Sequence, residues 1–120
     1  MDKTTLLKLF RDNLVKFFSI LYDSYKESDF LLYKMMVNDI PIEDTLIKFS
    51  NRILPHSSKV ENEEEKFFLE GDGIFEGLTP GRVNYFRDLW LGPRITPEEK
   101  VNIWKWFKLF LKIAQKYSKL

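Results

Sequence analysis

The 120-residue sequence has no cysteine and a single histidine, His56. A chain without cysteine has no disulfide framework, zinc knuckle or thiol nucleophile, and one histidine excludes a metal site built from several. No run of about 18 uncharged apolar residues is present, so we expect no membrane-spanning helix. Charged residues from Lys8 to Lys16 interrupt the apolar residues near the N-terminus, which leaves no signal-peptide core. These absences predict an intracellular protein.

Motifs of catalysis and cofactor binding are also missing. Three glycines stand close together at Gly71, Gly73 and Gly77, but no Gly-Lys-Ser or Gly-Lys-Thr follows to complete a phosphate loop. The carboxylates of residues 70–76 lack the order of a calcium loop, and no G-x-S-x-G or H-E-x-x-H motif occurs. We therefore expect a protein that is not an enzyme and has no cofactor or metal. No small-molecule substrate is evident.

What the sequence does contain is helical periodicity. Hydrophobic residues make up 44% of the chain and charged residues 31%, which is typical of one globular domain at this length. Apolar residues recur every three or four positions, as on the buried face of a helix. The pattern predicts an all-α fold: a compact single-domain bundle of five or six helices with a long C-terminal amphipathic helix. The expected helices cover residues 4–25, 28–37, 41–54, about 61–69, 80–91 and 97–118.

Cap residues and prolines mark the expected helix ends. Asp2 or Thr4 caps the first helix. Pro55 ends the third helix, because the residue before a proline resists the helical region, and residues 56–58 form a loop. The segment Thr96-Pro97-Glu98-Glu99 combines an N-cap, a proline at the first position and a capping box. This is the clearest helix start in the chain.

Two of the expected helices have an unusual composition. The second, which contains Phe30 to Val37, is apolar around most of its circumference, and this predicts that it is the central and most buried element. The fourth, over about residues 61–69, is acidic at its start, with Ser58 or Asn62 as alternative caps.

Charge is distributed unevenly along the chain. The net charge is +1, but residues 61–80 carry −6 and residues 100–120 carry +6. Five lysines of the last helix are three or four residues apart, so they fall within an arc of roughly 80°. We call them the lysine stripe: Lys105, Lys108, Lys112, Lys116 and Lys119. Apolar residues occupy the opposite side of the helix, which predicts a buried aromatic half and ammonium groups in water.

The lysine stripe allows several interpretations. It is the ordinary solvent face of an outer helix, a surface for a phosphate backbone, a membrane-surface helix, or a docking face for an acidic partner. The absence of arginine from the stripe argues against the reading of DNA bases, in which bidentate arginine contacts dominate. The acidic residues Glu63, Glu64 and Glu65 could pair with the stripe within the chain or in a neighbouring copy.

Tryptophans are concentrated in the last third of the chain. Trp104 and Trp106 point roughly 160° apart on the last helix, so they cannot both face the same neighbour. Both suit the core, and Trp104 is also a candidate anchor for a partner, since interface cores favour tryptophan and tyrosine.

Several hydrophobic motifs are similar to those of a known group of proteins. They are Ile42-Glu43-Asp44 with Ile53-Leu54-Pro55, Phe67-Phe68-Leu69, Val83-Asn84-Tyr85-Phe86 with Leu89-Trp90, and Ile103-Trp104-Lys105-Trp106-Phe107 with Ala114-Gln115-Lys116-Tyr117. Over most of its length the chain resembles small uncharacterised helical proteins encoded by nucleocytoplasmic large DNA viruses. The resemblance implies a virus-encoded helical protein of the host cytoplasm or nucleus, or of the virion. It implies no activity and no catalytic residue.

These observations lead to two functional hypotheses. The first is a non-enzymatic helical protein-interaction module that docks a protein partner or itself through a charged and Trp-rich C-terminal surface. The alternative is a nucleic-acid-associated protein that places the lysine stripe on the phosphate backbone. The candidate partner-binding residues are Lys105, Lys108, Lys112, Lys116, Lys119, Trp104, Glu63, Glu64 and Glu65.

Overall fold

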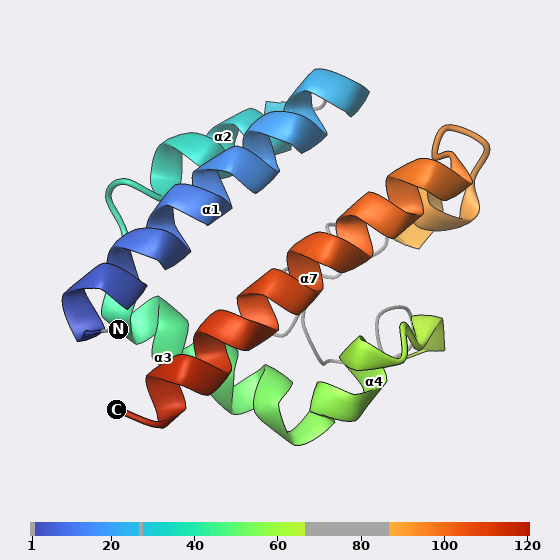
Figure 1. Ribbon diagram of the computed structural model, residues 1–120. Helices are drawn as coiled ribbons and strands as arrows, with labels where there is room; N and C mark the ends of the chain where they lie inside the picture. The colour runs from blue at the N-terminus through green and yellow to red at the C-terminus, as the bar shows by residue number, and fades with distance from the viewer. Residues whose placement is uncertain (1, 27, 67–86) are drawn as a thin grey trace. The chain divides into compact units, whose positions relative to one another are not determined.

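The computed structural model describes residues 2–26, 28–66 and 87–120, and most of these residues are helical (Figure 1). No strand occurs in these three ranges, which confirms the all-α prediction. Residues 87–91 are also helical. The named elements are α1 (Lys3–Tyr25), α2 (Ser28–Met36), α3 (Ile42–Ile53), the short 3₁₀ helix η1 (Leu54–His56), α4 (Ser57–Glu61) and α7 (Pro97–Ser118).

The chain divides into two compact units. The first unit consists of Met1–Ser50 and Lys112–Leu120, and the second of Asn51–Leu111. The first unit is therefore discontinuous in sequence, with the second inserted into it. The helix α7 contributes its first part to the second unit and its last turns to the first.

Helix α1 is capped by Asp2, one of the two N-caps that the sequence allows, and buries one apolar face. The amide of Thr5 donates to the carboxylate of Asp2 at 2.7 Å, which satisfies a free N–H of the first turn and lowers the pKa of Asp2. At the other end Lys26 adopts a left-handed conformation with φ of 56°, and its amide donates to Tyr22 O at 2.7 Å. The buried residues of α1 share one face and are Leu6, Phe10, Phe17, Leu21 and Tyr25.

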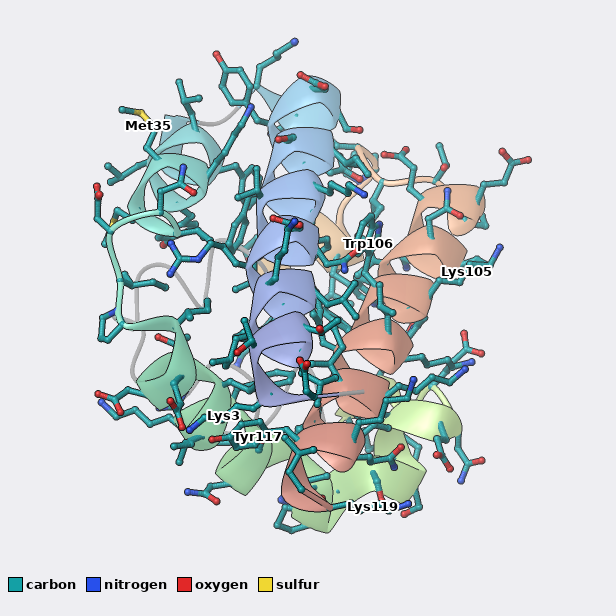
Figure 2. All side chains as sticks on the ribbon, turned by 60° about the vertical axis from the view of Figure 1, so that its left-hand side comes forward. Lys3, Met35, Lys105, Trp106, Tyr117 and Lys119 are labelled. Carbon is teal, nitrogen blue, oxygen red and sulfur yellow. The ribbon has the colours of Figure 1, made fainter. Side chains whose placement is uncertain are left out.

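Helix α2 lies beside α1 but is not the most buried element, so that prediction was wrong (Figure 1). Phe30 is buried, and the ring of Tyr33 lies 5.4 Å from that of Phe18 on α1. The apolar residues on the other side stay exposed, up to 62% at Met35, which points away from α1 in Figure 2. They are Leu31, Leu32, Met35 and Met36. A helix that is apolar all round does not reveal which of its sides will be covered.

The chain continues as helix beyond Pro55, where a loop was predicted. Helix α3 ends at Ile53, close to the predicted position, but η1 and α4 follow without a break. A proline is tolerated in the first turn of a helix because its missing N–H would have no partner there. The acidic helix was expected to begin at about residue 61, but Glu61 is instead the last residue of α4. Residues 65–66 are helical, and residues 67–69 lie outside the described part of the chain.

Helix α7 has the predicted bounds and the predicted start. Thr96 Oγ1 accepts from the amide of Glu99 at 3.1 Å, and Glu99 Oε1 accepts from the amide of Thr96 at 3.1 Å. This reciprocal pair is the capping box predicted from the sequence. The predicted start of the preceding helix, at Thr79-Pro80, lies outside the described residues.

Candidate docking surface on α7

The lysine stripe lies on the solvent side of α7. Lys105 extends away from the helix in Figure 2, and Lys112, Lys116 and Lys119 are exposed as well. Lys108 is the exception, because it is half-buried. Four lysines of the stripe lie within α7, and Lys119 follows directly after its last residue, Ser118.

Burial of the opposite side of α7 positions the stripe. Ile103, Phe107 and Ala114 are all buried, as the helical spacing predicts. Tyr117, at the end of the same face, is half-buried. Burial of this apolar face fixes the orientation of α7 about its own axis. The lysines on the opposite side therefore remain in water.

Lys108 contacts the acidic segment that follows α4. Its Nζ donates to Glu63 Oε2 at 3.0 Å, and both side chains are partly exposed. We call residues 61–65 the acidic turn. The contact lies within the second unit and shows that the acidic and basic segments meet in one chain.

The other members of the acidic turn have different surroundings. Glu65 Oε1 accepts a hydrogen bond from Trp90 Nε1 at 3.2 Å, so this carboxylate holds a buried indole. Glu64 is exposed to solvent. The three candidate glutamates therefore do not form one uniform surface.

Trp104 lies in the core, although it is among the candidate partner-binding residues. It is 4% exposed, and its ring makes edge-to-face contacts with Trp90 at 6.0 Å and Phe107 at 5.8 Å. Such ring pairs stabilise a core beyond the area that they bury. Trp106 is half-buried and lies 6.1 Å from the ring of Phe110. The accessible part of the candidate surface thus consists of lysines and glutamates.

A second polar cluster lies in the first unit and was missed at the sequence level. Tyr117 Oη donates to Glu43 Oε1 at 2.9 Å, and Lys3 Nζ donates to the same oxygen at 2.6 Å. Hydrogen bonds from Lys3 and Tyr117 lower the pKa of Glu43, and the same contacts raise the pKa of Lys3 and of Tyr117. No spacing rule could find this cluster, because 74 residues separate Glu43 from Tyr117.

The described part of the chain contains a small hollow but no cluster of metal-binding side chains. Within it, no group of three or more His, Asp or Glu side chains could hold a metal ion. A hollow of about 170 Å³ is lined by Asp88, Leu89, Gly92, Pro93 and Arg94. Ligand pockets usually measure about 300–1,000 Å³. The acidic glycine segment 70–76 lies outside the described residues.

None of the described helices is both long and apolar enough to cross a membrane.

Comparison with protein-family models, curated proteins and solved structures finds no match to this chain. The resemblance to viral proteins therefore stays a prediction.

Proposed function

We propose that the protein is a non-enzymatic interaction module that docks an acidic segment of another protein on the lysine stripe of α7. The proposal is carried by the exposure of the stripe lysines and by the one carboxylate contact that they already make. Four of its lysines are exposed, and the fifth, Lys108, already holds the carboxylate of Glu63. The chain thus supplies an example of the ligand chemistry that the stripe accepts. An intracellular location is part of the proposal.

The composition of the stripe favours a protein ligand over a nucleic acid. Lysines act as point charges, whereas base recognition and bidentate phosphate recognition favour arginine, and the stripe contains no arginine. Exposed single pairs contribute only about 0–1 kcal/mol each, so several lysines must act together. The spacing of the stripe allows this, since four of its lysines lie within α7 three or four residues apart and Lys119 follows the helix directly.

Fluorescence anisotropy with two labelled probes, a poly-glutamate peptide and a random-sequence DNA duplex, tests the proposal. We expect the peptide to bind at low salt and to dissociate as salt rises, because exposed charges are screened. The double variant Lys112→Ala/Lys116→Ala should bind the peptide at least fivefold more weakly. A matched control is Lys8→Ala/Lys16→Ala, which removes two exposed lysines of α1 and the same charge.

Three outcomes would overturn the proposal. The wild-type protein could fail to bind the peptide at low salt, or the control could lose as much affinity as the stripe variant. DNA could also bind more tightly than the peptide at equal salt, with a log–log salt slope near −0.9 per phosphate contacted. That last result would assign the stripe to nucleic acid.

A further inference from the structure

The backbone at Glu63 has a conformation that glycine normally supplies. The amide of Glu64 donates to Lys59 O at 2.9 Å, and the amide of Glu63 donates to Val60 O at 3.1 Å. These two bonds form a Schellman motif at the end of α4, and Glu63 occupies its left-handed position with φ of 54°. A residue with a Cβ is disfavoured there. Glutamate therefore works against the turn locally, although it adds a carboxylate that reaches α7.

The acidic turn is held by two contacts within the second unit. One is the contact of Glu63 with Lys108, and the other is the hydrogen bond from the buried Trp90 to Glu65. The hydrogen bond between Trp90 and Glu65 anchors the acidic turn, and the contact between Glu63 and Lys108 covers one lysine of the stripe. This explains why Lys108 alone among the five lysines is half-buried.

We propose that Glu63 is a built-in competitor for the lysine stripe, an autoinhibitory contact that an acidic partner must displace from Lys108. The inference rests on the proposed function and adds a form of regulation to it. A partner carboxylate and the Glu63 carboxylate need the same ammonium group, so only one of them can hold it. Because the pair is partly exposed, it shifts the binding equilibrium by a few-fold, and it tunes the affinity of the stripe without blocking it.

Glu63→Gln tests the competitor role, since it removes the charge and keeps the shape of the side chain. We expect the poly-glutamate peptide to bind about two- to fivefold more tightly than to the wild type. Glu63→Gly should act in the same direction, because glycine suits the left-handed position and preserves the turn. The matched control is Glu64→Gln, which removes the same charge from an exposed neighbour.

A second measurement reports the contact without a ligand. Reductive methylation followed by mass spectrometry compares the reactivity of individual lysines. We expect Lys108 to react more slowly than Lys105 in the wild type and to become faster in Glu63→Gln but not in Glu64→Gln.

The outcomes separate the two proposals. Peptide binding that Glu63→Gln leaves unchanged, or that Glu64→Gln strengthens equally, would overturn the competitor role alone. Unchanged reactivity of Lys108 in Glu63→Gln would do the same. If neither the wild type nor Glu63→Gln binds the peptide, the proposed function fails and the competitor role fails with it.

Discussion

Trp104 shows how a residue that suits an interface can belong to the core. Its ring contacts those of Trp90 and Phe107, and truncation would remove a large buried side chain from the second unit. We expect Trp104→Ala to lower the free energy of unfolding by about 3–5 kcal/mol in urea titrations. Trp106→Ala, at a half-buried position on the same helix, should cost less. A Trp104→Ala protein with wild-type stability and weakened partner binding would contradict this placement.

The cluster around Glu43 predicts a specific response to acid. The folded-state pKa of Glu43 lies below its ordinary value of 4.5, so its contribution to stability is present above pH 4.5. The contribution is lost as the pH falls below 4.5 through the folded-state pKa. We expect the melting temperature of the wild type to fall more between pH 7 and pH 3 than that of Glu43→Gln.

The control for this experiment is Asp44→Asn, which removes the same charge one residue away. It should keep the acid response of the wild type. Equal acid responses in the wild type and Glu43→Gln would show that the contacts with Lys3 and Tyr117 do not form in solution.

At the scale of the element, α7 depends on its capping box. Thr96 Oγ1 satisfies the amide of Glu99, which has no partner within the helix. Thr96→Ala should therefore cost about 0.5–2 kcal/mol of stability in chemical denaturation, whereas Thr96→Ser should stay close to the wild type because it keeps the hydroxyl. Equal losses in the two variants would show that the cap does not act through its oxygen.

Substitutions on the two sides of α2 should change the stability of the protein by different amounts. Met35 on the exposed side should accept glutamine with a change in stability within about 0.5 kcal/mol. Replacement of Phe30, on the buried side, by alanine should lower the free energy of unfolding by about 3–5 kcal/mol. Thermal denaturation compares the two variants. A large loss in Met35→Gln would mean that the outer side of α2 is covered in the folded protein.

The same two helices show how far sequence reasoning extends. The bounds of α7 were predictable because its start depends on four adjacent residues, 96–99, and its faces on a regular spacing. The covered side of α2 was not predictable, because apolar residues surround it. The continuation of the helix past Pro55 was missed because a proline can begin a helical segment as well as end one.

Some features of the candidate site were likewise predictable from the sequence, and others were not. The exposure of four stripe lysines follows from the periodicity of one helix. The contact of Lys108 with Glu63 depends on a tertiary approach across 45 residues and on a left-handed turn, neither of which has a local signal. The position of Trp104 was open at the sequence level because a tryptophan suits both a core and an interface.

At the scale of the whole molecule, opposite charges on separate segments favour weak self-association. Residues 61–80 carry −6 and residues 100–120 carry +6, so a second copy offers an acidic segment to the lysine stripe. We expect static light scattering to give a mass above the monomer value of 14.4 kDa at low salt and that value at high salt. A protein that stays monomeric at every ionic strength would contradict self-docking and restrict the stripe to a different acidic protein.

The discontinuity of the first unit has a consequence for synthesis on the ribosome. Translation delivers residues 51–111 before residues 112–120, so the second unit has its whole chain while the first still lacks its closing segment. Glu43 is made early, but it can accept the hydrogen bond from the Tyr117 hydroxyl only after Tyr117 has emerged. The part of the protein that is begun first is thus the last to be finished, and a nascent chain stalled before Lys112 would carry α1, α2 and α3 without the segment that completes their unit.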